Sequence, residues 1–298
     1  MALHIFCALK CEAEPIIDNF KLIRLNDFKL FKIYQSIDQE TSLVITNVGK
    51  NNAKNAVAYH HDCIKTTKSD IWFNIGIAGH ENIAIGEIRL INKIVDSKNK
   101  SCWYPQIIFD PPCDSIDLIS LERPSNEYQT CLYDMEASGF YSAASQYGIS
   151  ELIHSVKVIS DNSSSSISQI NKDQVKQIVR SKMSIIKIIL DKLRLLSVEM
   201  QTINKQPKDY EYFLKKWHFT QTEKHQLHNL ILKLNIRYPN KDFLKITENL
   251  DNGKLVLKKL AINYCKTLFC LTYTKEKKSK TIKSHMQFLF YLVMMSEH

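Results

Sequence analysis

Three acidic residues, far apart in the chain, stand where an α/β protein places reactive groups. Glu12 follows a short apolar run, Glu136 opens a small-residue helical segment, and Asp161 directly follows a strand-like run. Reactive groups collect beyond the C-terminal ends of strands, where loops and helix N-termini offer free backbone N–H groups. Carboxyl groups at such places can act as general acid or base. Each also has a plainer interpretation, because a glutamate at a helix start is more often a cap and a Ser-Asp pair often makes a turn or an N-cap.

A glycine-containing segment adds to these acidic residues. Residues 74–79, Asn-Ile-Gly-Ile-Ala-Gly, follow strand-like residues and predict a tight turn that leaves backbone close to whatever binds there. A Gly-x-x-Gly sequence after a strand is too common to identify a ligand. The adjacent His80 could lie near the site or cap the turn.

The elements that would position these residues alternate between strand and helix. Runs of strand length and apolar or alternating character cover residues 4–8, 41–48, 71–76, 85–95 and 154–160. Helical spacing covers residues 51–66, 137–147 and 167–196. This alternation predicts an α/β layer fold around a largely parallel or mixed sheet.

The last third of the chain differs from the rest in charge. Residues 1–195 carry 22 basic and 22 acidic side chains, whereas residues 196–298 carry 18 and 9, so the net charge of +9 lies entirely in the last third. Patterns there are mostly helical, although the last could also hold strands, and they cover residues 210–217, 221–234, 243–249 and 255–272. We therefore expect two domains, residues 1–198 and a small, mostly helical, basic domain at residues 199–298.

The basic C-terminal third allows three interpretations. Lysine clusters with interleaved aromatic residues, such as Lys215-Lys216-Trp217-His218 and residues 275–280, suit the phosphate backbone of a nucleic acid. The same composition describes the solvated surface of a small helical domain. The segment could also close over the site or form an oligomer interface.

The overall composition excludes several classes of protein. With 44% hydrophobic and 24% charged residues, the chain is neither disordered nor a membrane channel, and the apolar stretch 286–295 is about half as long as a membrane-spanning helix. Eight cysteines without framework spacing and an N-terminus unlike a signal peptide predict free thiols and a cytoplasmic location. The segment His60-His61-Asp62-Cys63 lacks a second ligand pair, so we expect no metal and no cofactor.

Taken together, five segments in this order and spacing resemble the superfamily of purine nucleoside phosphorylases and methylthioadenosine/S-adenosylhomocysteine nucleosidases. The segments are residues 8–15, 46–53, 74–79 with Gly86-Glu87, 133–137 and 158–161. The resemblance covers residues 1–195 and leaves out residues 200–298. It implies a three-layer αβα fold with a central mixed sheet, and a homodimer.

The resemblance also implies roles for the acidic residues in cleaving the bond between ribose and a purine. The sugar becomes oxocarbenium-like and the purine leaves poorly as an anion, so an acid must protonate it. Asp161 matches the proton donor to purine N7, Glu12 matches the base that activates water, and Glu136 matches the group that binds the ribose hydroxyls. A carboxyl group needs a raised pKa, or a bound water that relays the proton, to serve as this acid at neutral pH.

Further residues match the family's substrate-binding positions. They are Met135, which would pack against the sugar, and Ile77, Gly79, Ser160 and Lys157. Two of them have plainer interpretations, because a buried methionine is more often core filling and Lys157 could be an exposed residue at the end of a strand.

Water, rather than phosphate, is the predicted nucleophile. Phosphorylases hold phosphate with arginines in early loops and a hydroxyl residue in the glycine segment, but here Ile77 occupies that position and the early loops offer only Lys10. We therefore predict a hydrolase of a purine (adenine) nucleoside such as methylthioadenosine, S-adenosylhomocysteine or 5′-deoxyadenosine. The alternatives are a phosphorylase with a different phosphate site and a non-catalytic nucleoside sensor whose basic domain contacts nucleic acid.

One region departs from the family. Residues 95–134 form a shorter stretch than the equivalent region of its members, which holds the base, so purine selection could differ. Trp103, Tyr104 and Tyr128 are the aromatic residues available to stack on a base, although an aromatic residue in a loop is more often a packing residue.

Overall fold

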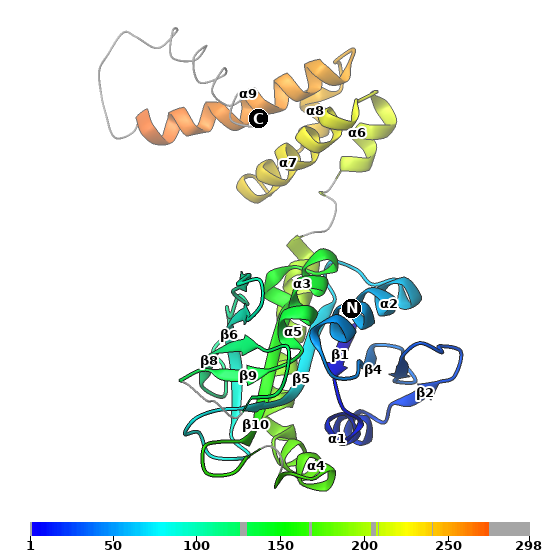
Figure 1. The fold of residues 1–298 in the computed structure, drawn as a ribbon. Helices are drawn as coiled ribbons and strands as arrows, with labels where there is room; N and C mark the ends of the chain where they lie inside the picture. Colours follow the sequence, from blue (N-terminus) through cyan, green and yellow to red (C-terminus); the bar gives the residue numbers. More distant parts are fainter. Residues whose placement is uncertain are drawn as a thin grey trace. The chain divides into compact units, whose positions relative to one another are not determined.

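The chain divides into two compact units, Met1–Asn204 and Lys205–His298 (Figure 1). The computed structural model describes residues 2–125, 130–166, 169–203, 207, 209–239 and 241–273. Each unit has its own hydrophobic core within this described part.

A mixed ten-stranded sheet forms the centre of the first unit, in the order β10-β6-β8-β9-β5-β1-β4-β3-β2 with β7 paired to β6. The strands are β1 (Leu3–Cys7), β2 (Ile23–Leu25), β3 (Lys32–Gln35), β4 (Thr41–Ile45), β5 (Ile71–Gly79), β6 (Ile88–Asp96), β7 (Cys102–Trp103), β8 (Ser115–Ser120), β9 (Leu132–Asp134) and β10 (Ile153–Asp161). Strands β4, β1, β5 and β10 run parallel, whereas β6 pairs antiparallel with β10. Strand β5 pairs with both β9 and β10, so the path β10-β6-β8-β9-β5 closes on itself.

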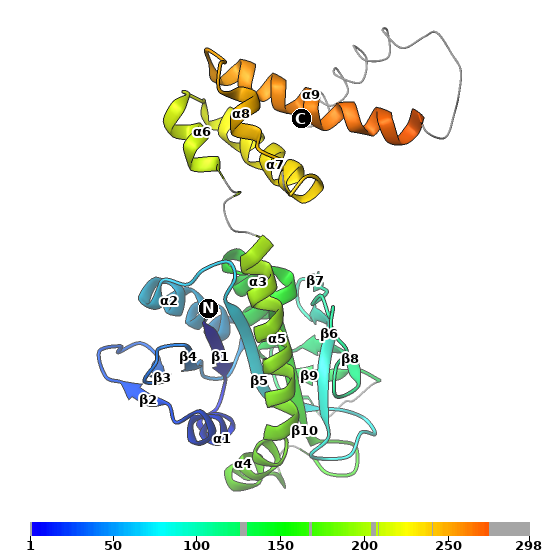
Figure 2. The same cartoon turned by 180° about the vertical axis from the view of Figure 1, so that it is seen from behind.

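Helices cover both faces of this sheet (Figures 1 and 2). The helices are α1 (Lys10–Phe20), α2 (Lys50–Ile64), α3 (Ala137–Tyr147), α4 (Lys172–Ser181) and α5 (Met183–Ile203). One apolar core joins α1, α4 and α5 to the sheet, and a second core joins α2 and α3 to the opposite face. Residues of β1 alternate between them, since Ile5 packs in the first core and Phe6 in the second. A strand buried on both faces is expected to be apolar throughout. The predicted three-layer αβα fold with a mixed sheet is confirmed.

Two details of the predicted elements are wrong. The single helix expected over residues 167–196 is two helices, because the backbone of Lys182 leaves helical geometry between α4 and α5. The strand expected to end at residue 76 continues to Gly79, so the glycine segment is strand rather than turn. Helix α5 also continues across residue 198, the expected boundary between the two domains.

The described part of the second unit is helical. Its helices are α6 (Tyr210–Lys216), α7 (Gln221–Arg237), α8 (Phe243–Thr247) and α9 (Gly253–Tyr273). They enclose a core that includes Phe213, Trp217, Leu227 and Leu260. The lysine-rich segment 275–280 and the apolar stretch 286–295 lie outside the described residues. Within the described residues, no helix combines the length and apolar character needed to cross a membrane.

Candidate active site

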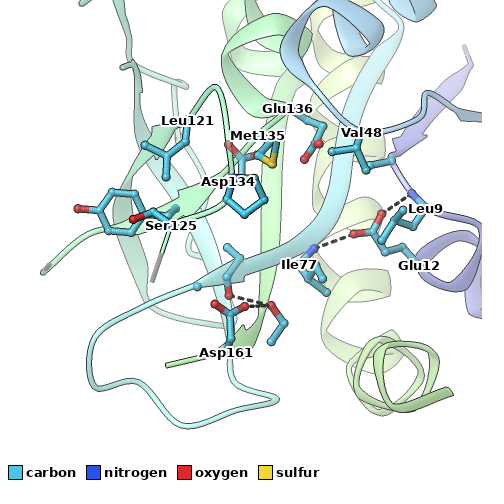
Figure 3. Close-up of a pocket in the computed structure, with 16 residues that line it drawn as sticks. Leu9, Glu12, Val48, Ile77, Leu121, Ser125, Asp134, Met135, Glu136 and Asp161 are labelled. Carbon is cyan, nitrogen blue, oxygen red and sulfur yellow. Dashed lines mark hydrogen bonds between the residues drawn. The ribbon is translucent and has the colours of Figure 1, made fainter. Parts of the chain in front are cut away.

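A cavity of about 230 Å³ opens at the C-terminal ends of the parallel strands (Figure 3). Its lining residues are Ala8, Leu9, Glu12, Val48, Ile77, Ala78, Gly79, Leu121, Pro124, Ser125, Tyr133, Asp134, Met135, Glu136, Ser160 and Asp161. The volume is below the range of roughly 300–1,000 Å³ that is typical of ligand pockets, which limits the occupant to a small molecule. Glu12, which precedes Glu136 and Asp161 by more than a hundred residues in the chain, therefore shares one cavity with them.

Glu12 is fixed in position by two backbone N–H groups. Its carboxylate accepts a hydrogen bond of 2.8 Å from the N–H of Leu9 and one of 3.0 Å from the N–H of Ile77. The side chain is buried, and burial raises the pKa of Glu12 although both N–H groups and the charge of Lys157 oppose the rise. A carboxylate in this state is oriented and more basic than an exposed glutamate.

Gly76 serves close packing beside Glu12. A Cβ atom at Gly76 would lie 3.4 Å from Oε1 of Glu12 and 3.1 Å from Nζ of Lys157. The glycine is therefore explained by the two side chains that crowd against its Cα. The chain turns only after β5, where Nδ1 of His80 accepts hydrogen bonds of 3.0 Å from the N–H groups of Asn82 and Ile83. His80 thus caps the turn.

Glu136 links the N-termini of two helices. It occupies the N-cap position of α3 but makes no side-chain cap bond, and instead accepts a hydrogen bond of 2.8 Å from the N–H of Gly49 at the start of α2. Gly49 has φ +111°, a left-handed conformation that favours glycine. Burial, together with the nearby charge of Asp134, raises the pKa of Glu136 to about 7. The interpretation of Glu136 as only a helix cap is wrong.

Asp161 and Ser160 lie at a bulge at the end of β10. The pairing with β5 shifts register between Ile159 and Asp161, and such a bulge re-aims the side chains next to it. The hydroxyl of Ser160 donates a hydrogen bond to Oδ1 of Asp161, and both residues are buried. The N-cap of the following helix α4 is Asn171, whose Oδ1 accepts from the N–H of Gln174. Asp161 is therefore not the helix cap that the sequence also allowed.

Solved structures of nucleosidases are similar in fold to this chain. A methylthioadenosine/S-adenosylhomocysteine nucleosidase of Campylobacter jejuni is 11% identical with a TM-score of 0.53, and the match covers 64% of this chain and 99% of that chain. A methylthioadenosine nucleosidase of Arabidopsis thaliana is 14% identical with a TM-score of 0.54, covering 64% and 95%. A nucleosidase of Colwellia psychrerythraea in complex with adenine is 13% identical with a TM-score of 0.51, covering 62% and 93%.

The chain contains the methylthioadenosine/S-adenosylhomocysteine nucleosidase fold. No protein-family model matches its sequence, and no curated protein is significantly similar to it in sequence. The matched share, 64% of 298 residues, is close to the size of the unit Met1–Asn204. The predicted resemblance is confirmed in fold, and about a third of the chain extends beyond it.

Lys157 lies beneath the cavity of this nucleosidase fold. Its side chain is only 1% exposed, its Nζ is 2.8 Å from Oδ2 of Asp134, and it does not line the cavity. Burial lowers the pKa of Lys157, but the carboxylates of Asp134, Glu136 and Glu12 outweigh burial and raise it. The alternative of an exposed lysine at the end of a strand is wrong.

The aromatic residue in the cavity is not one that the sequence singled out. Trp103 packs against the core beside α2 and α3, Tyr104 is 59% exposed, and neither lines the cavity. Tyr128 lies outside the described residues. Tyr133 lines the cavity directly before Asp134, at the end of the nucleosidase sheet. The signal that could have identified it is its place next to the Asp-Met-Glu sequence.

The charged side chains that line the cavity are acidic. Among its described lining residues there is no lysine, arginine or histidine. Lys10 is 66% exposed and pairs with Glu14, and Lys50 pairs with Asp96. No group of three His, Cys, Asp or Glu residues in the described part of the chain is placed to hold a metal ion.

Proposed function

We propose that this chain hydrolyses the N-glycosidic bond of a purine nucleoside. The observation that carries the proposal is the meeting of three buried carboxyl groups, Glu12, Glu136 and Asp161, around one small cavity. Each group has a different environment, which is what division of labour among acid, base and binding group requires.

The proposed reaction assigns one task to each carboxyl group. Glu12 takes a proton from the attacking water, because its two backbone hydrogen bonds hold it in one orientation and burial makes it more basic. Asp161 gives a proton to the purine, and the hydroxyl of Ser160 holds its carboxyl group. Glu136 binds the ribose hydroxyls and stabilises the positive charge that develops on the sugar. Met135 forms the apolar wall beside the sugar.

Water is the proposed nucleophile because phosphate would find no partner. Phosphate sites use arginine, lysine or groups of backbone N–H donors, whereas the described lining of this cavity carries the acidic side chains of Glu12, Glu136 and Asp161 and no cation. The N–H of Ile77, which faces the cavity where a phosphate donor could stand, is occupied by Glu12. An anionic nucleophile would be repelled, whereas water would not.

Adenine nucleosides with an uncharged or zwitterionic 5′ substituent are the proposed substrates. The similar structures from Campylobacter jejuni and Colwellia psychrerythraea are named for methylthioadenosine and S-adenosylhomocysteine. We therefore propose methylthioadenosine, S-adenosylhomocysteine and 5′-deoxyadenosine as the first compounds to test. A 5′-phosphate is disfavoured by the same acidic lining.

The test is release of free base by the full chain. Each nucleoside is incubated with and without phosphate, and free adenine is measured by chromatography. Hydrolysis predicts equal release in both conditions and free ribose sugar as the second product. Release that depends on phosphate, or no release from any purine nucleoside, would overturn the proposal.

Matched variants separate the acidic residues from their neighbours. Glu12→Gln and Asp161→Asn are expected to lower kcat by about 10²-fold or more. Glu14→Gln, on the same helix and paired with Lys176, and Asp173→Asn, exposed at the start of α4, are the controls and should retain full activity. Full activity in Glu12→Gln would remove its role as base.

A further inference from the structure

Asp134 lies in the wall of the cavity, and its side chain is directed into the protein interior. Its side chain is fully buried, so the part of Asp134 that reaches the cavity is its backbone. Oδ1 accepts a hydrogen bond of 2.6 Å from the hydroxyl of Ser120, and Oδ2 accepts one of 2.8 Å from the N–H of Ala137 and lies 2.8 Å from Nζ of Lys157. Both oxygens of this carboxylate therefore have partners within the protein.

Lys157 lies beside Glu12 and within range of the charge of Glu136. A Cβ at Gly76 would touch both Nζ of Lys157 and Oε1 of Glu12, so these two groups flank the same Cα atom. Burial raises the pKa values of Glu12, Glu136 and the thiol of Cys7, and the charge of Lys157 opposes each rise. The ammonium group therefore influences the ionisation of several groups, although its direct ion pair among the described residues is with Asp134.

The far side of Asp134 is held by a chain of buried polar groups. The hydroxyl of Ser120, which donates to Asp134, accepts a hydrogen bond of 2.9 Å from the N–H of Ser138. The hydroxyl of Ser138 donates one of 3.1 Å to Asp96, and Asp96 lies 3.0 Å from Nζ of Lys50. Strands β6, β8 and β9 and helix α3 thus fix the Asp134 carboxylate, which cannot turn toward the cavity.

We propose that Asp134 is a positioning residue that holds the ammonium group of Lys157 beneath the cavity, beside Glu12, so that the cation acts on Glu12 and Glu136 without pairing with either. This inference rests on the proposed function, because it assigns the residue that organises the same site. An ammonium group free of Asp134 would turn to Glu12 or Glu136 and neutralise a group that must remain available to water or ribose.

A purely structural ion pair would not have this arrangement. A buried ion pair is no more stabilising than well-packed apolar residues, so stability alone does not account for it. A structural pair would also need no further carboxyl groups around the cation, whereas here two others lie within reach of its charge. The difference is measurable, because the positioning role predicts a loss of kcat in Asp134→Asn in addition to the change in ionisation that removing either charge causes.

The first experiment is the pH dependence of kcat/KM in two variants of the full chain. The acidic limb is the rise of kcat/KM with increasing pH as the carboxyl groups of the site ionise. Asp134→Asn leaves the cation unopposed, so this limb should move to lower pH, and kcat should fall as the ammonium group pairs with Glu12. Lys157→Met removes the cation, so the limb should move to higher pH; each shift is expected to be on the order of one unit. Asp117→Asn, which removes the partner of the half-exposed Lys93 on the same sheet, is the matched control and should leave the limb in place.

The second experiment needs no turnover and so separates this inference from the proposed function. The protein is labelled with ¹³C at glutamate carboxyl groups, and the signal of Glu136 is assigned by its loss in Glu136→Gln. Its titration midpoint should fall in Asp134→Asn and rise in Lys157→Met relative to the unsubstituted protein. Midpoints that stay the same in both variants, or an activity loss equal at every pH, would show a merely structural pair and overturn the inference.

Discussion

The backbone N–H of Gly49 donates a hydrogen bond of 2.8 Å to the carboxylate of Glu136, which lies 87 residues further along the chain. The bond joins the start of α2 to the start of α3, so the carboxyl group is held by the N-terminus of α2, whose dipole favours a negative charge. Burial nevertheless raises its pKa to about 7. The group is therefore poised to change ionisation near neutral pH.

Glu136→Gln tests the need for this negative charge. The amide oxygen can still accept from Gly49, so the fold should be kept while kcat/KM falls by about 10²- to 10³-fold. In the unsubstituted protein, kcat/KM should rise as the pH increases through 7, and the variant should lack that rise. Steady-state kinetics from pH 5.5 to 8.5 and thermal unfolding measure both effects. A variant that keeps the rise near pH 7 would assign it to another group.

Gly76→Ala tests the crowding beneath the cavity. The added methyl group would lie 3.1 Å from Nζ of Lys157 and 3.4 Å from Oε1 of Glu12, so both side chains must shift by a few tenths of an ångström. We expect kcat to fall by about 10²-fold, since small displacements of positioned groups are costly in rate, with a loss of about 1–2 kcal/mol in stability.

Gly139→Ala is the matched contrast, because it is the same substitution in another crowded position. Its methyl group would lie only 2.0 Å from the backbone oxygen of Lys50, where no flexible side chain can give way. Kinetics and thermal unfolding of both variants should show mainly lost activity for Gly76→Ala and mainly lost folding for Gly139→Ala. The reverse pattern would contradict our interpretation of Gly76.

Tyr133→Leu tests which aromatic residue holds the base. Tyr133 lines the cavity, and burial together with the thiol of Cys131 raises its pKa to about 12, so its hydroxyl stays neutral. Loss of the aromatic contact is worth about 0.5–1.5 kcal/mol, which predicts a KM about 3- to 10-fold higher with kcat little changed. The exposed Tyr104, changed to Leu, is the control. Equal effects of the two substitutions on KM would argue against base stacking by Tyr133.

His154→Gln tests a source of acid sensitivity in the core. Burial lowers the pKa of His154 to about 4, whereas an unfolded histidine has a pKa of about 6.5. Below pH 6.5 the unfolded chain therefore binds a proton that the folded chain does not, and stability falls as the pH decreases from 6.5 to 4. The full effect is about 3 kcal/mol.

The measurement for His154 is urea unfolding at several pH values. Glutamine keeps a donor for the backbone oxygen of Glu151, which lies 3.0 Å from Nε2 of His154. The variant should lose less stability than the unsubstituted protein between pH 7 and pH 5. His61→Gln, a half-buried histidine of the same unit, should leave the pH dependence unchanged. The same slope in all three proteins would mean that another group is responsible.

The sequence predicted the main sheet, the helices that cover it and the three acidic residues, because these depend on local patterns and on order along the chain. It did not predict α1, where Pro15 interrupts the helical pattern, or the short strands β8 and β9, which mix polar and apolar residues over few positions. Whether Lys157 is buried or exposed depends on Asp134, a partner 23 residues earlier that only the folded sheet brings into contact. The glycine segment was misjudged for the same reason, since the side chains that require Gly76 come from α1 and β10.

The contact between α2 and α3 determines which substitutions this chain can accept. Since the peptide oxygen of Lys50 occupies the space where any side chain at position 139 would begin, the two helices cannot be moved apart and repacked without also withdrawing the N–H of Gly49 from Glu136. Residues 136 and 139 are thus under one shared constraint. A chain with a larger residue at position 139 would have to hold the glutamate at position 136 in another way.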